Sequence, residues 1–175
     1  MKIEGSSIAF IVICTGLVFL MTPALAFFYG GLERRKNVIS TMMMSVVSLA
    51  IATVMWFAVG YSLSFSGDGN LIGDLGHAFF QGVSDSESTR GLTIPDSLFA
   101  VFQMMFSIIT VGILTGSVVG RMRFKPLLIF IVGWLLLVYY PFAHMVWDEG
   151  LLAQWGTIDF AGGDVVHITS GVSGL

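Results

Sequence analysis

Four long stretches of this sequence carry almost no charge, and they constrain the fold more than any other feature. They cover residues 8–29, 38–65, 96–120 and 126–147. A helix needs roughly 20 apolar residues to cross about 30 Å of hydrocarbon, and each stretch is long enough. Charged residues make up only 11% of the chain, against about 25% in soluble domains. The sequence therefore predicts an all-α fold, a bundle of helices that crosses a lipid bilayer several times.

A fifth hydrophobic segment is predicted over residues 160–175, with its start near Asp159–Asp164. From Gly163 onward it would rise only about 20 Å as a helix, which is too short to cross a bilayer alone. We therefore expect further sequence, or another chain, to complete this span.

The first apolar stretch also has features of a cleaved signal peptide. Lys2 precedes it, and the small-residue sequence Ala24-Leu25-Ala26 resembles a cleavage site. The stretch is longer than usual for a signal peptide, however, and it runs directly into the basic cluster at 34–36. This stop-transfer pattern favours a retained span.

The charged residues predict the orientation. Six of the eight basic residues lie in two short loops, at Arg34, Arg35, Lys36, Arg121, Arg123 and Lys125. Because two spans separate these loops, both face the same side, which the positive-inside rule makes the cytoplasm. All acids except Glu33 lie toward the other side. We expect a multi-pass protein of the cell membrane (inner or plasma), with its N-terminus outside and an acidic outer surface.

Several classes of function lack support in the sequence. A net charge of −3 gives no reason to expect nucleic acid as a partner. No nucleotide-binding loop, metal-binding cluster or nucleophile triad is recognisable, so we expect neither an enzyme nor a cofactor. The connection at 66–95 is rich in Gly, Ser and Asp, which indicates a solvated loop with an exposed His77.

Polar residues inside spans are costly, so each is a candidate functional residue. His167 stands one to two turns into the last apolar segment, with no acid at helical contact spacing. Apolar surroundings disfavour the charged imidazolium, and a neutral ring, with one donor and one acceptor, suits a small neutral amine. A core histidine bonded to a backbone carbonyl would fit the pattern equally well.

Asp159 precedes the same segment. Its position favours a helix cap, in which the carboxylate accepts backbone N–H bonds at the positive end of the helix dipole. A direct cation ligand is the alternative, and the two roles are compatible.

Two aromatic residues complete the candidate site. Phe106 lies within the third span and Trp147 ends the fourth at its outer end. Each has an ordinary explanation, as packing for Phe106 and as an interfacial residue for Trp147. Together they could form a cation–π vestibule worth about 0.5–2 kcal/mol. A charge at the bilayer centre costs about 2.5 kcal/mol or more, so a cation that sheds its proton and crosses as a neutral molecule fits best. Ammonium can do this; sodium and potassium cannot.

Several motifs, in order, resemble those of the ammonium transporter (Amt/Mep/Rh) family, in its microbial Amt branch. They are Ala26-Phe27-Phe28-Tyr29-Gly30-Gly31-Leu32 with Arg35-Lys36-Asn37, Gly60-Tyr61-Ser62, Phe102-Gln103 through Phe106, Pro141-Phe142-Ala143-His144-Met145-Val146-Trp147, and Asp159-Phe160-Ala161-Gly162-Gly163 with Val165-Val166-His167. The resemblance extends over nearly the whole chain.

This resemblance implies an eleven-span protein of two inverted halves, of which these residues form the first five spans, the fifth truncated. It further implies a homotrimer with one pore per subunit, and remaining spans supplied by sequence beyond Leu175. By position Phe106 resembles the outer gate, Trp147 and Asp159 resemble parts of an external ammonium site, and His167 resembles the first of two pore histidines. The chain departs from the family pattern after Trp147, where two acids, Asp148 and Glu149, stand in place of glycines.

The function expected from the residues and the resemblance is transmembrane transport of ammonium or ammonia. An external cation would be recruited, deprotonated and passed along the pore as the neutral amine. The alternative is an ammonium-sensing receptor of the same fold, coupled to a cytoplasmic signalling domain or regulatory partner. A non-selective helical channel is a third possibility, but it does not explain why these aromatic residues and His167 occur together.

Overall fold

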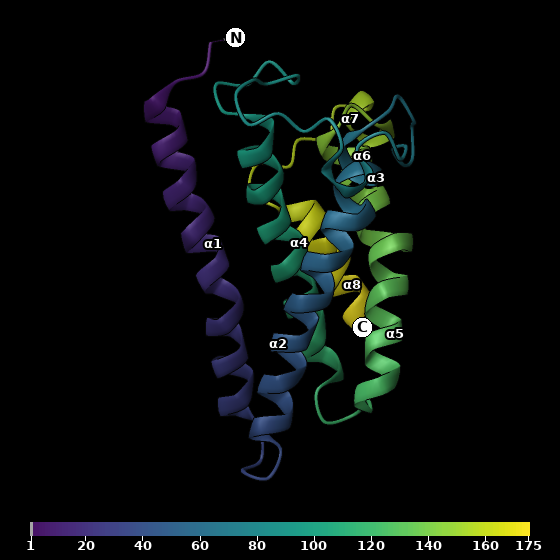
Figure 1. Ribbon diagram of the computed structural model, residues 1–175. Coiled ribbons are helices and arrows are strands. Elements are labelled where there is room, and N and C mark those ends of the chain that lie inside the picture. The colour runs from purple at the N-terminus through teal and green to yellow at the C-terminus, as the bar shows by residue number, and fades with distance from the viewer. Residues whose placement is uncertain (1) are drawn as a thin grey trace.

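The computed structural model describes residues 2–175, and within this range it contains helices and no strands. The prediction of an all-α bundle is confirmed. Four helical rods are long and apolar enough to cross a membrane (Figure 1). They are α1 (Gly5–Leu32); α2 (Val38–Met55), η1 (Trp56–Gly60) and α3 (Tyr61–Phe65); α4 (Asp96–Val118); and α5 (Phe124–Trp134), η3 (Leu135–Tyr139), α6 (Tyr140–Trp147) and α7 (Leu151–Gln154).

The chain ends in a shorter helical piece, formed by η4 (Gly163–Ile168) and α8 (Thr169–Gly174). It packs beside α4 and α6. The connection at 66–95 contains one short 3₁₀ turn, η2 (Ala78–Phe80). Phe79 and Phe80 adopt left-handed backbone conformations there, with φ of 55° and 58°.

The third rod ends two residues earlier than predicted and the fourth begins two residues earlier, in both cases for local reasons. The third ends at Val118 because Gly120 adopts a left-handed conformation, with φ of 71°. The fourth begins at Phe124, ahead of Pro126. Proline is tolerated in a first helical turn because its missing N–H would have no partner there.

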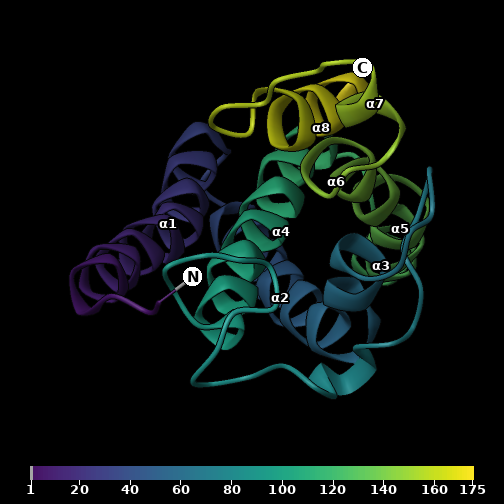
Figure 2. The same cartoon turned by 90° about the horizontal axis from the view of Figure 1, so that it is seen from above.

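Helix α4 is the centre of the bundle, and α1 lies at its edge (Figure 2). The second half of α4 is almost wholly buried, with one face against α1 and another against α2 and α8. By contrast α1 buries only Thr22, Ala26 and Gly30. Large apolar side chains cover the rest of α1, as expected of a helix with a broad lipid-facing surface.

Two glycines of α4 allow α1 to approach closely. A Cβ at Gly116 would lie 2.4 Å from the ring of Tyr29, and one at Gly112 would contact Leu25. The Tyr29 hydroxyl donates a hydrogen bond to the carbonyl of Ile113 at 3.2 Å. Small residues at four-residue spacing are a common helix-packing surface in lipid, where association depends on close contact.

An aromatic cluster fills the outer half of the core. Trp56 is fully buried, and its indole N–H donates to the carbonyl of Ala100 at 3.0 Å, which ties η1 to α4. Its ring lies 6.1 Å from Tyr61 and 5.9 Å from Tyr140. Gly60 makes room for Tyr140, because a Cβ there would come within 2.5 Å of the ring.

In the described part of the chain, π-helical turns interrupt two of the rods at η1 and η3, and a further one, η4, begins the last helical piece. Such turns insert one extra residue and occur often at functional sites. Pro141 lies in the first turn of α6, just after η3, and the helix continues through it.

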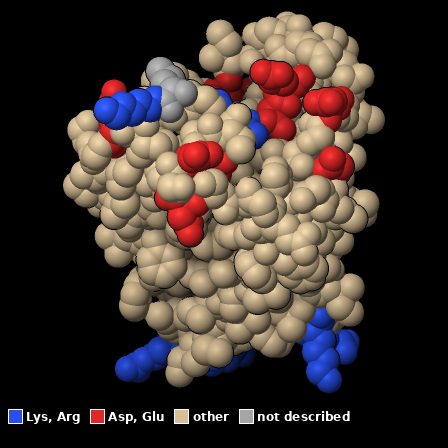
Figure 3. Space-filling model, turned by 45° about the horizontal axis from the view of Figure 1, so that its top comes forward, with Lys and Arg blue, Asp and Glu red and all other residues tan. Residues whose placement is uncertain are grey.

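Charge is segregated along the bundle. Figure 3 shows most basic side chains at one end of the rods and the acidic side chains toward the other, where some basic atoms also lie. The basic end holds the 33–37 and 119–123 connections, and the acidic end holds the 66–95 connection and residues 148–162. We call the acidic end the outer end below, after the orientation that the sequence predicts.

We predict that Gly60→Ala destabilises the protein by about 1–3 kcal/mol, because the new methyl group would overlap a fully buried ring. The measurement is thermal unfolding of the purified protein in detergent. Gly133→Ala is the matched control, since no atom lies within 4 Å of its added Cβ and alanine favours a helix over glycine. Equal stability of Gly60→Ala and wild type would contradict this account of the core.

Candidate functional site

Three of the four predicted site residues line one pocket at the outer end. Phe106 from α4, Trp147 from the end of α6 and Asp159 from the turn before η4 form parts of its wall. The pocket has a volume of about 540 Å³. Its remaining lining residues are Arg90, Leu92, Phe99, Phe102, Gln103, Phe160, Ala161 and Gly162.

Aromatic rings make up one side of this pocket, which we call the aromatic pocket. The rings of Phe106 and Trp147 meet edge to face, with centroids 5.9 Å apart and planes at 69°. Phe102 packs against Phe106 in the same manner, with centroids 5.1 Å apart. An edge-to-face contact covers only one face of one of the two rings, and a ring face is the part that attracts a cation.

Asp159 caps the last helical piece. Its Oδ1 accepts a hydrogen bond from the Gly163 N–H at 2.8 Å, and its Oδ2 accepts from Asp164 at 3.1 Å and Val165 at 2.9 Å. The geometry is that of the capping role that the sequence favoured. These bonds compensate the carboxylate, while it still places negative charge at the pocket wall.

His167 lies in η4 beside a second, smaller pocket of about 390 Å³, which shares Asp159 with the aromatic pocket. In this chain the His167 ring is exposed, and its burial in the complete protein stays a prediction. Val165, Val166 and Thr169 are buried in contact with the bundle, whereas His167 lies on the exposed side of the helix. Helical periodicity explains this, because the face that packs on α4 and α6 cannot also present His167 to them.

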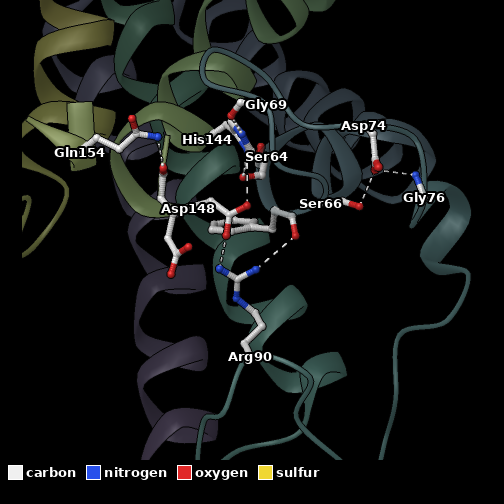
Figure 4. A network of polar contacts seen from close by, with 11 residues as sticks. Ser64, Ser66, Gly69, Asp74, Gly76, Arg90, His144, Asp148 and Gln154 are labelled. Carbon is white, nitrogen blue, oxygen red and sulfur yellow. Dashed lines mark hydrogen bonds and ion pairs between the residues drawn. The ribbon is translucent and has the colours of Figure 1, made fainter. Parts of the chain in front are cut away.

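A polar network that the sequence did not predict joins the 66–95 connection to the end of α6 (Figure 4). Arg90 forms an ion pair with Asp148 and donates a hydrogen bond to the Phe65 carbonyl at 3.2 Å. Asp148, one of the two acids that depart from the family pattern, is thus a paired residue whose side chain is only 12% exposed. Its partner is 58 residues away in the sequence.

His144 lies beside Asp148 and is fully buried. Its Nε2 is 2.5 Å from the Gly69 carbonyl, and its Nδ1 is 3.2 Å from the Ser64 carbonyl and 3.4 Å from Asp148 Oδ2. The ring therefore bridges α6 and the loop. No charge or spacing pattern in the sequence indicated this role.

Two other residues order the same loop. The Ser66 hydroxyl and the Gly76 N–H both donate to Asp74 Oδ1, and these bonds lower the pKa of that carboxyl group. The loop should therefore lose this stabilisation as the pH falls through the lowered pKa. His77, expected to be freely exposed, is half-buried; its Nδ1 lies 2.8 Å from the Gln81 carbonyl and its ring packs on Tyr61.

Comparison with known proteins gives consistent matches. A family described as the Ammonium Transporter Family matches residues 9–175. An ammonium transporter of Bacillus subtilis is 49% identical over 166 residues, which cover 95% of this chain and 41% of that protein. The chain therefore spans about two fifths of the length of this relative.

Solved structures of similar fold give matches of the same kind. The crystal structure of Saccharomyces cerevisiae Mep2 superposes with a TM-score of 0.89 at 36% identity, covering 99% of this chain and 41% of that one. A structure titled Sensor Amt Protein superposes with a TM-score of 0.81 at 28% identity, covering 94% of this chain and 41% of that one.

We predict that Asp159→Ala destabilises the start of η4 by about 1–3 kcal/mol, because three backbone N–H groups lose their acceptor. Hydrogen–deuterium exchange at residues 163–165 should become faster. Asp164→Ala removes the same charge one turn away, from a side chain with no hydrogen bond in the described structure, and should leave this exchange unchanged. Equal exchange in both variants would contradict the capping role.

Proposed function

The chain belongs to the ammonium transporter family, and from that premise we propose that the complete protein moves ammonium or ammonia across a membrane. The observation that carries the proposal is the aromatic pocket, which brings Phe106, Trp147 and Asp159 together at the acidic end of the bundle. Its proposed activity is transport, with no catalysed reaction.

The pocket suits recruitment of a small cation. Acidic residues at the outer end raise the local cation concentration, and the ring faces contribute about 0.5–2 kcal/mol of attraction. This gain is smaller than the cost of carrying a charge to the bilayer centre. The cation would therefore leave its proton near the pocket and continue as the neutral amine.

We propose that His167 follows Phe106 on this path. The pocket beside His167 neighbours the aromatic pocket, and the two share Asp159, which supports this order. In the complete protein we expect the remaining spans to cover the exposed face of η4, so that His167 would line a narrow pore. A neutral imidazole there can both donate to and accept from ammonia.

The finer architecture belongs to the same proposal. We expect five spans here, the fifth truncated, in an eleven-span protein of two inverted halves that assembles as a homotrimer. The segregation of charge supports a cell-membrane orientation with the basic loops in the cytoplasm and the N-terminus outside.

A second candidate function is ammonium sensing through an attached cytoplasmic domain or partner. The similarity to the structure titled Sensor Amt Protein supports it. The sequence beyond Leu175 distinguishes the two functions. A second membrane half with a short tail favours transport, whereas an output domain favours sensing.

We predict that Trp147→Leu raises the apparent KM for ammonium uptake by about 2- to 30-fold, the factor that corresponds to the lost cation–π attraction. The maximal rate should change less. The assay is ammonium-dependent current or uptake by the complete protein in proteoliposomes. Trp155→Leu, at an exposed tryptophan outside the aromatic pocket, is the matched control. An unchanged KM in Trp147→Leu would exclude the recruitment role.

For His167→Ala we predict a changed ratio of transported charge to transported ammonium, because the group that guides the neutral amine is lost. The measurement combines current with uptake on the same proteoliposomes. His77→Ala removes a histidine of the outer loop and should keep the wild-type ratio. If current and uptake are both unaltered in His167→Ala, the pore-lining role is refuted.

A further inference from the structure

Two pockets at the outer end share one charged side chain, that of Arg90. It lines the aromatic pocket together with Trp147, and it also lines a neighbouring polar pocket of about 380 Å³. The polar pocket carries three carboxylates, from Asp68, Asp148 and Glu149. Arg90 and its partner Asp148 therefore stand where the acidic surface of the protein meets the proposed cation site.

The backbone beside Arg90 is held firmly. The carboxylate of Asp96, which is 2% exposed, accepts hydrogen bonds from the backbone N–H and the hydroxyl of Thr89 at 2.8–3.2 Å. The Asp96 N–H in turn donates to the Glu87 carbonyl at 3.0 Å. These bonds attach the end of the loop to the first turn of α4, so the guanidinium has a defined place.

The Arg90 guanidinium contacts two aromatic rings and a carboxylate. It lies 5.1 Å from the ring centroids of both Phe65 and Phe99 and is 23% exposed. Asp148 pairs with one of its nitrogens, and His144 Nδ1 lies 3.4 Å from the other oxygen of that carboxylate. In the sequence it is the one Lys or Arg between positions 37 and 120.

A positive charge in this wall has a direct electrostatic consequence. An unpaired guanidinium would repel a cation in the aromatic pocket, and partial burial would weaken the screening of that repulsion. An unpaired Asp148 would attract the cation and slow its departure inward. Paired, the two charges largely cancel at the distance of the pocket.

We propose that the Arg90–Asp148 pair sets how strongly the outer pocket holds its cation. Because the two charges offset each other, the cation can bind in the aromatic pocket and can also leave it. Asp148 prevents Arg90 from repelling the cation, and Arg90 prevents Asp148 from retaining it. This inference rests on the proposed function, because it takes the aromatic pocket as the cation site.

The two partners should have opposite effects on cation affinity. Asp148→Asn leaves the guanidinium unpaired and should raise the apparent KM for ammonium by roughly three- to tenfold, as for unit charges about 10 Å apart in a partly solvated site. Arg90→Gln leaves the carboxylate unpaired and should lower the KM by a similar factor, with a lower maximal rate because release slows. Both shifts should shrink at high ionic strength.

A purely structural ion pair would behave differently, because loss of either partner would break the same contact and move the KM in the same direction. Arg90→Gln combined with Asp148→Asn should return the KM to near the wild-type value. Asp85→Asn removes an acid from the same loop outside both pockets and should have no effect. Shifts of the same sign in the two single variants, or a double variant no closer to wild type, would overturn the proposal.

A second measurement separates this inference from transport itself. Fluorescence quenching of Trp147 by caesium ions should increase in Arg90→Gln and decrease in Asp148→Asn, while quenching by neutral acrylamide stays constant. Trp147→Phe variants supply the background signal. If the wild-type protein moves no ammonium but caesium quenching shifts as expected, the proposed function fails and the charge balance stands. If transport is present but caesium quenching is equal in all variants, only the charge balance is refuted.

Discussion

The hydrocarbon of a bilayer offers no hydrogen-bond partner, and most features of this structure satisfy that constraint. Backbone groups of the spans bond within their own helices, and many hydroxyl side chains bond back to a carbonyl one turn earlier. These include Thr15, Ser48, Thr53, Thr110, Thr169 and Ser170. Such side chains add polarity without needing water, so the spans remain compatible with lipid. A polar group that bonds to another helix, such as the Trp56 indole, therefore helps to position helices relative to one another.

The outer end is assembled from contacts that join distant parts of the chain. Asp96 holds the end of the long loop, Arg90 reaches from that loop to Asp148, and His144 joins α6 to Gly69. Trp147 immediately precedes Asp148, so the same network fixes one wall of the aromatic pocket. On the opposite wall, Asp159 holds the start of η4. The pocket is thus formed between elements that these contacts hold together, although most of its residues lie at helix ends and in loops.

Hydropathy and charge were sufficient to predict the helical bundle, because a span in lipid has few alternatives and long apolar runs are unmistakable. The cap at Asp159 was also predictable, since it depends on residues within one helical turn. His167 was different: its exposure depends on which face of η4 packs against α4, and a pattern of apolar residues on all sides does not specify that face. The pairing of Arg90 with Asp148 was beyond prediction as well, because it joins residues 58 positions apart through a loop without regular structure. Features that depend on neighbouring residues could be predicted from the sequence, whereas polar contacts between distant residues could not.

The π-helical turns have a consequence for how this protein can vary. Each contains one residue more than an α-helical turn, and a single residue rotates everything downstream by about 100° around the helix axis. Loss of one residue from η3 would leave a longer, more regular helix of unchanged hydrophobicity, yet it would turn Trp147 away from Phe106. The same change in η4 would turn His167 onto another face. Insertions and deletions at these points would thus leave the hydropathy and the helix content almost unchanged, but they would rotate the side chains that line the pocket. Related chains are therefore best aligned by which residues share a helix face.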